Sequence, residues 1–172
     1  MKIIEVQPKS DPWAHATLYV DTGEGDISEA VLTDMDAKDD VLATKRTWLK
    51  AGDKVTVWWG PGVDEVDDVG DANKNGTRDL YVENDPPPTA TDDQLVLISN
   101  GEILDAACWA NGDGNIAQPE LRDISELVGK GQWIGQFSSG DESGLVAYEG
   151  QTMARQKTSA KFADTNSSKD WK

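Results

Sequence analysis

Cysteine and histidine are almost missing from this sequence, which has one of each among 172 residues. A single cysteine, Cys108, excludes a disulfide within the chain. A nucleophilic cysteine needs a base beside it, and His15 lies far from Cys108 in the sequence. We therefore interpret Cys108, in the apolar run "ILDAACWAN", as a buried residue, and His15 as a residue at the edge of a strand.

Long apolar runs and positive charge are also scarce. No apolar run approaches the ~18 residues of a membrane-spanning helix, so we expect no membrane span. The first residues, "MKIIEVQPKSDPW", carry an apolar patch too short for a signal peptide. Lys and Arg total 16 against 32 Asp and Glu, which gives a net charge of −16. Such a surface repels phosphate backbones, so we expect no nucleic-acid partner, whereas divalent cations or basic partners are compatible with it.

The sequence is rich in short apolar or alternating runs bounded by turn residues, a pattern typical of β-strands. The pattern predicts strands at residues 2–7, 16–21, 28–34, 45–50, 54–59, 93–99, 102–109, 143–149 and 152–157. Asn100 and Gly101 form the strongest two-residue hairpin signal. Spacings of about ten residues with frequent turns predict one antiparallel β-sandwich domain over residues 1–172.

One segment, "AQPELRDISELVGKG", departs from the strand pattern. Its apolar residues recur at helical spacing: Leu121, Ile124, Leu127 and Val128. Pro119 suits the first turn of a helix, and Gly129 and Gly131 suit its end. The segment predicts one short amphipathic helix over residues 118–129 that covers an end or an edge of the sandwich.

Residues 63–93 interrupt the regular spacing of the strands with a long acidic insertion. It holds ten acids against two bases, Lys74 and Arg78, and it ends in the stiff stretch "NDPPPTATDD". A loop of this length inside a compact domain is usually functional or disordered. Its clustered carboxylates repel one another, which favours a bound counterion.

The stretch "GDANKNGTRDLY" inside this insertion has the spacing of a calcium loop. Positions 1, 3, 5 and 9 carry the side chains that would bind the ion, Asp71, Asn73, Asn75 and Asp79. Gly76 at position 6 permits the sharp turn, and Thr77 offers its backbone carbonyl. The spacing predicts a calcium site that orders the insertion, with a dissociation constant near ~10⁻⁴–10⁻³ M.

The predicted calcium loop lacks its usual last ligand, because Val82 stands at position 12. Glu83, one residue later, is a candidate, and Asp64, Asp67 or Asp68 could fold back instead. The alternative is a solvated polar turn, in which Asp, Asn and Gly form local hydrogen bonds.

A second polar stretch, "NGDGNIAQPE", carries oxygen-bearing side chains at Asn111, Asp113, Asn115 and Glu120. Its glycines interrupt the alternation that a calcium loop needs. We interpret the stretch as an ordinary turn into the helix, with Asn115 as the cap.

Tryptophan is frequent, with seven residues. Packing in a β-sandwich core is the favoured interpretation, because large aromatics suit pleated, half-buried surfaces. Trp58 and Trp59 are neighbours in one predicted strand, so their side chains point to opposite faces and at most one lies in the core. The other is a candidate platform for stacking a sugar.

No catalytic constellation stands out in the sequence. It has no glycine-rich phosphate loop, no Cys/His spacing for zinc and no nucleophile elbow. Pairs of carboxylates carry no information where acids number 32. We therefore expect a protein that is not an enzyme.

Four segments together resemble a lamin tail domain of the bacterial and archaeal type. They are "IIEVQP" at 3–8, "ISEAVLTDMD" at 27–36, "DDQLVLISNGEILDAACWANGDG" at 92–114 and "GQTMARQKTSAKFADTNSSKDW" at 150–171. The stretch "HATLYVDT" lacks the acidic-aliphatic pattern of the family, and residues 64–93 are a long insertion. The resemblance implies an immunoglobulin-like sandwich that serves as a binding or attachment module.

The sequence and the resemblance together predict a non-catalytic binding or scaffold module of a secreted or surface protein, stabilised by calcium. Its partner would be a protein or a cell-surface polymer. One alternative is a calcium-assisted carbohydrate-binding module that uses Trp58 or Trp59. Another is an accessory domain of a metal-dependent hydrolase, which would need an open metal position and a base.

Overall fold

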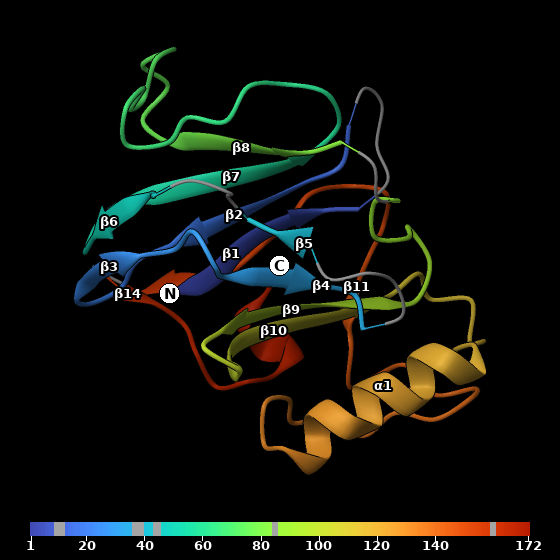
Figure 1. Ribbon diagram of the computed structural model, residues 1–172. Helices are drawn as coiled ribbons and strands as arrows, with labels where there is room; N and C mark the ends of the chain where they lie inside the picture. The colour runs from blue at the N-terminus through green and yellow to red at the C-terminus, as the bar shows by residue number, and fades with distance from the viewer. Residues whose placement is uncertain (9–12, 36–39, 43–45, 84–85, 159–160) are drawn as a thin grey trace.

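The computed structural model describes the chain except for residues 9–12, 36–39, 43–45, 84–85 and 159–160. Two five-stranded sheets pack face to face, and one helix lies beyond the second sheet (Figure 1). The first sheet has the order β12 (Met153–Ala154), β1 (Lys2–Gln7), β2 (His15–Tyr19), β7 (Lys54–Trp59) and β8 (Arg78–Val82). The second has the order β11 (Val146–Ala147), β10 (Glu102–Ala110), β9 (Asp93–Ser99), β4 (Val31–Thr33) and β5 (Asp40–Val41).

Smaller elements complete the fold at the ends of the two sheets. They are the ribbons β3 (Glu24–Asp26) with β6 (Trp48–Lys50) and β13 (Lys157–Thr158) with β14 (Lys161–Phe162), the helix α1 (Gln118–Gly129) and the 3₁₀ turn η1 (Ser168–Asp170). The prediction of a mainly β sandwich with one short helix is therefore confirmed.

The core forms where alternate side chains of the two sheets meet. In β7, Val55 and Val57 are fully buried and Trp59 is nearly so, whereas Trp58 is only partly buried. This is the alternation that a strand with one core face requires. The prediction that at most one of the two neighbouring tryptophans lies in the core is confirmed.

Strand periodicity located several elements well. Predicted strands 2–7, 54–59 and 93–99 coincide with β1, β7 and β9, and the predicted helix coincides with α1. The strands predicted at 28–34, 143–149 and 152–157 are shorter in the structure, where β4, β11 and β12 have two or three residues each. The strand predicted at 45–50 begins outside the described residues. Inside the predicted acidic loop lies an unforeseen strand, β8, which pairs with β7 in parallel. The pair β10–β11 is parallel as well, so the sandwich is not antiparallel throughout.

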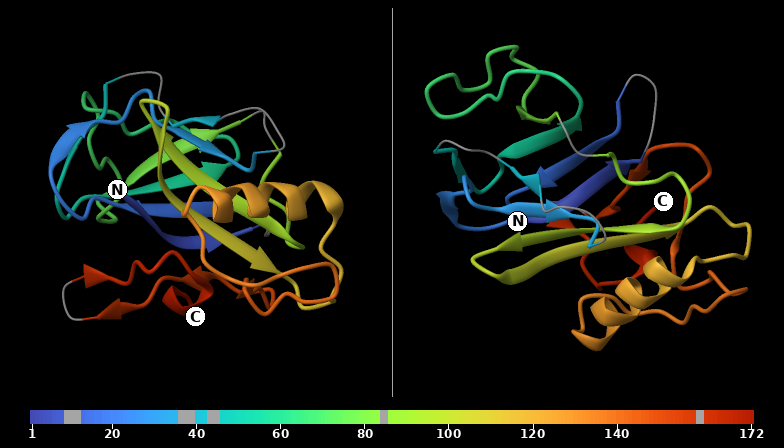
Figure 2. Two further views of the ribbon diagram at one scale, coloured as in Figure 1. Left: turned by 90° about the horizontal axis from the view of Figure 1, so that it is seen from below. Right: turned by 45° about the vertical axis from the view of Figure 1, so that its right-hand side comes forward.

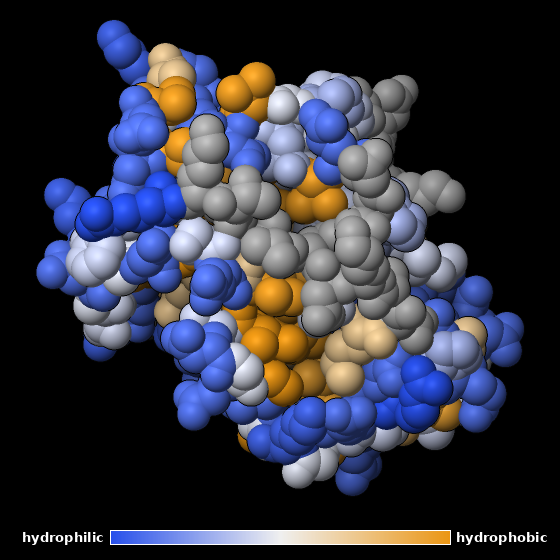
Figure 3. All heavy atoms as spheres, in the orientation of Figure 1, coloured by the Kyte–Doolittle hydropathy of each residue, from blue (hydrophilic) through white to orange (hydrophobic). Residues whose placement is uncertain are grey.

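The helix α1 packs its apolar side against the second sheet. Ile124 and Leu127 are fully buried, and Pro119 occupies the first turn, as expected from its fixed φ. Figure 2 shows α1 running across the strands β9 and β10, far from the loop of residues 63–77 that precedes β8. The face seen in Figure 3 is mostly hydrophilic, with hydrophobic residues gathered near its centre, over β4 and β9.

Candidate functional site

The predicted calcium loop, residues 71–79, leads directly into β8 at the edge of the first sheet. Asp71 holds its turn, because Oδ1 accepts from the backbone N–H of Asn75 at 3.1 Å and Oδ2 accepts from that of Gly76 at 3.0 Å. Gly76 has a φ of 87°, a conformation that a side chain would strain. The alternation of polar residues thus produces the tight turn that the motif predicts.

Three of the four predicted ligand side chains meet at one atom. The amides of Asn73 and Asn75 both donate to Oδ2 of Asp79, at 2.7 and 3.0 Å. Asp79 is buried, and its Oδ1 accepts from the indole N–H of Trp58 at 3.1 Å. The amide oxygens accept from backbone N–H groups, Oδ1 of Asn73 from Asn75 and Oδ1 of Asn75 from Thr77, each at 2.9 Å. A cation at Asp79 would therefore require both amides to turn their oxygens toward it and give up these two bonds.

The two remaining predicted ligands differ in position. Thr77 lies beside the cluster, with its hydroxyl 3.1 Å from that of Thr56. Glu83 is exposed and follows the far end of β8. Because an extended strand rises ~3.3 Å per residue, Glu83 lies about 13 Å along the chain from Asp79. The structure therefore does not bring Glu83 to the loop.

Glu65 is the residue of this loop that sequence reasoning missed. It is buried, and its carboxylate accepts from the backbone N–H groups of Ala72, Asn73 and Asp79 at 3.0, 3.3 and 3.0 Å. Two of the acids considered in its place bind elsewhere: Asp64 accepts from the Tyr81 N–H, and Asp67 accepts from the Trp48 N–H. Glu65 stands six residues before the motif, so only the return of the chain brings it to the base of the loop.

The proposed sugar-stacking residues are not free platforms. Trp59 belongs to the core, and the ring of Trp58 lies 4.7 Å from that of His15, centroid to centroid. The more exposed indoles are those of Trp13 and Trp48. Trp59 is therefore wrong as a stacking residue, because β7 turns it inward.

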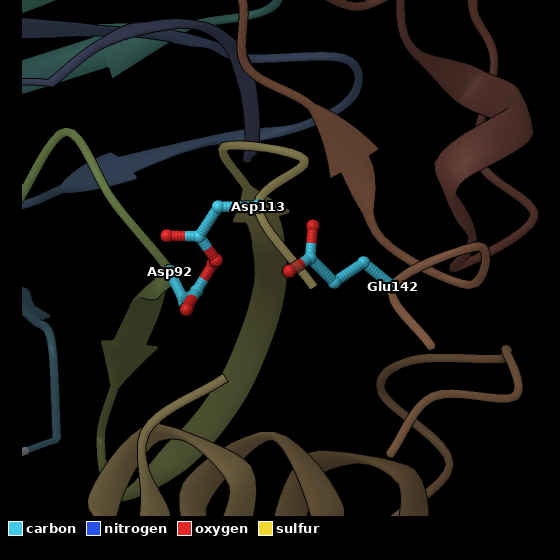
Figure 4. Close-up of side chains that lie close together, drawn as sticks. All are labelled: Asp92, Asp113 and Glu142. Atoms are coloured by element: carbon cyan, nitrogen blue, oxygen red, sulfur yellow. The ribbon is translucent and has the colours of Figure 1, made fainter. Parts of the chain in front are cut away.

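A second cluster of acids lies at one end of the second sheet. Asp92 precedes β9, Asp113 follows β10, and Glu142 precedes β11, so three adjacent strands place them. One carboxylate oxygen from each lies within 4.8 Å of the others. Figure 4 shows the three carboxylates facing one another from three separate segments. This arrangement could hold a metal ion.

Backbone N–H groups position the carboxylates of this acid cluster. Glu142 accepts from Gly112 at 2.8 Å, and Asp113 accepts from Asn115 at 2.8 Å. Burial raises the pKa of Asp92 above its ordinary value, and the hydrogen bond from the Asn111 N–H partly opposes this rise. The negative charges of Glu142, Asp113 and Glu120 raise the pKa of Asp92 further.

The interpretation of "NGDGNIAQPE" as an ordinary turn with Asn115 as the helix cap needs correction. The N-cap of α1 is Ala117, which makes no side-chain cap hydrogen bond. Asn115 instead donates its N–H to Asp113, which belongs to the acid cluster. The sequence offered little signal, because Asp92 and Glu142 lie more than twenty residues from Asp113 on either side.

The fold and these two acidic regions define the protein as a mainly β sandwich with an acidic insertion. No helix in the described part of the chain is both long and apolar enough to cross a membrane. Comparison of the chain with protein-family models, curated proteins and solved structures gives no match. The resemblance to lamin tail domains therefore stays a prediction.

Proposed function

We propose that this protein is a non-catalytic binding or scaffold module whose acidic insertion is ordered by Ca²⁺ bound in the 71–79 loop. The observation that carries the proposal is the convergence of Asn73 and Asn75 on the buried carboxylate of Asp79. The two amides present their NH₂ groups to Asp79 here, and with Ca²⁺ bound their oxygens would face the ion together with the carboxylate. Ca²⁺ takes six to eight oxygen ligands in flexible geometry. Thr77 adds a backbone carbonyl, and water fills the remaining positions.

Electrostatics support an ion at this loop. The insertion has ten acids and two bases, and the whole chain has a net charge of −16. A divalent cation in the loop offsets part of this repulsion. Dissociation constants of ~10⁻⁴–10⁻³ M are typical of extracellular calcium modules, which fits the proposed place of the protein at a cell surface or outside the cell. Its partner on this proposal is a protein or a cell-surface polymer.

The test is thermal unfolding with chelator and with added Ca²⁺. With about 10 mM Ca²⁺, a site of this affinity stabilises the native state by about 1.4–2.7 kcal/mol, a rise in Tm of about 3–10 °C. The Asp71→Asn variant should lose the part of the calcium-dependent rise that the loop contributes. Asp68→Asn, which changes the same charge at an exposed position of the insertion, should keep it.

Identical melting curves with chelator and with Ca²⁺ would contradict the calcium site. A screen for hydrolysis of phosphodiesters and glycosides with added divalent ions tests the non-catalytic part. Turnover that disappears with Asp79→Asn would show a hydrolase and overturn that part of the proposal.

A further inference from the structure

We propose that Asp92, Asp113 and Glu142 form a second binding site for a hard divalent cation. This site lies at one end of the second sheet, whereas the 71–79 loop lies at the outer edge of the first sheet. The two sites share no residue, and each can fail without the other.

Buried oxygens without partners are the first support. Oδ1 of Asp92, Oε1 of Glu142 and Oε2 of Glu120 are all buried and form no hydrogen bond. Asp92 as a whole is only 5% exposed. A buried polar atom without a partner costs about 1–3 kcal/mol, and more where the group is charged. The first two belong to the acid cluster, and together they indicate a ligand that satisfies both.

The geometry suits an ion. One oxygen of each carboxylate is held by the backbone: Gly112 donates to Oε2 of Glu142, Asn115 to Oδ1 of Asp113, and Asn111 to the carboxylate of Asp92. These bonds orient the carboxylates toward one another (Figure 4). Two oxygens that each lie about 2.4 Å from one ion are at most about 4.8 Å apart. The ligand atoms of the three acids meet this limit.

The charge of the site selects the kind of ligand. The charged groups that act most strongly on Asp92 are the carboxylates of Glu142, Asp113 and Glu120. Like charges at this spacing repel, and an ion with two positive charges would turn the repulsion into attraction. All the ligand atoms are oxygens, which favours Ca²⁺ or a similar hard cation over zinc or copper.

A bound ion would add a further link between segments that single hydrogen bonds already join. Its ligands come from the connector before β9, the turn after β10 and the segment before β11. The ion would therefore hold these three connections together at one end of the second sheet.

Calcium binding to the full chain, measured by titration calorimetry with Ca²⁺ alone, tests the second site. The wild-type chain should bind two equivalents, and Asp113→Asn should bind one, because Asp113 is exposed and its loss should leave the fold intact. Asp92→Asn should also bind one, and circular dichroism should show its fold retained. The matched control is Glu102→Gln, which removes one exposed charge at the other end of β10 and should bind two.

The outcomes separate this site from the proposed loop site. Asp71→Asn should lose the other equivalent and keep the one that depends on Asp113. If Asp113→Asn and Asp92→Asn bind as many ions as Glu102→Gln, with less than a threefold change in affinity, the acids hold a proton in place of a cation and the second site is excluded. If Asp71→Asn binds no Ca²⁺ while Asp113→Asn and Asp92→Asn bind as the wild-type chain does, the loop is the calcium site and the acid cluster is excluded as a second one.

Discussion

At the scale of single residues, Arg155 and Asp105 form the polar contact that joins the two sheets. The Arg155 side chain is fully buried, its Nη2 lies 3.0 Å from Oδ1 of Asp105, and its guanidinium stacks 4.9 Å from the Trp171 ring. Oδ2 of Asp105 accepts from the Ile3 N–H at 2.6 Å. One carboxylate in β10 thus contacts β1 and the residue after β12, across the sandwich.

We predict that Arg155→Met destabilises the protein by about 3–5 kcal/mol, because it leaves a buried carboxylate without its cation. Replacing both partners, Arg155→Met with Asp105→Leu, should cost less than the single change, since no buried charge then remains. Urea unfolding of the two variants measures this difference. A loss below about 1 kcal/mol for Arg155→Met would show that solvent reaches the carboxylate.

Cys108 shows how far a single residue can be predicted from sequence. Its apolar neighbours indicated burial, and the thiol is indeed completely buried in β10. Burial raises the pKa of Cys108 well above its ordinary value, so the thiolate that a nucleophile needs does not form. Arg155 gave no comparable signal, because its burial depends on Asp105, fifty residues away.

At the scale of elements, the strand β8 anchors the acidic insertion to the first sheet. Its parallel pairing with β7 places Asp79 beside Trp58. The carboxylate of Glu65 accepts a hydrogen bond from the Asp79 N–H at the base of the loop. The strand escaped prediction because "TRDLY" was interpreted as part of a polar metal motif, although Leu80 and Val82 follow the alternation of a strand. Strands β1, β7 and β9 were predicted because their short runs rich in apolar residues have no such competing pattern.

We predict that Glu65→Ala destabilises the insertion more than any exposed acid of the same segment. The change removes three hydrogen bonds from backbone N–H groups to a buried carboxylate, which are worth about 1.5–3 kcal/mol each before relaxation. A net loss of about 2–4 kcal/mol is expected, together with faster hydrogen exchange at Asp79. Glu83→Ala is the control, and we expect it to stay within about 0.5 kcal/mol.

Equal exchange rates at Asp79 in Glu65→Ala and Glu83→Ala would contradict this role for Glu65. The loop would then be held by β8 and by Asp71 without help from the buried carboxylate. The measurement needs no added metal, so it is independent of both calcium proposals.

At the scale of the whole molecule, sheet topology creates the acid cluster. Asp92, Asp113 and Glu142 converge because β9, β10 and β11 are neighbours, a fact that follows from strand order and not from local sequence. The 71–79 loop could be predicted from the sequence, because its candidate ligand residues lie close together in one segment at the spacing of a known turn. A site whose ligands come from three separate connections between strands can be recognised only when the order of the strands is known.

The net charge of −16 gives the last prediction. Mutual repulsion destabilises the compact state, and salt screens it, since the Debye length falls from ~30 Å at 0.01 M to ~3 Å at 1 M. With chelator present throughout, we expect Tm to rise by about 2–6 °C between about 20 mM and about 0.5 M NaCl. A variant with Asp68, Glu83 and Glu102 replaced by Lys loses six units of negative charge at exposed positions and should show a smaller rise. An equal rise in both proteins would mean that salt acts through apolar burial instead, because screening must follow the charge that it screens.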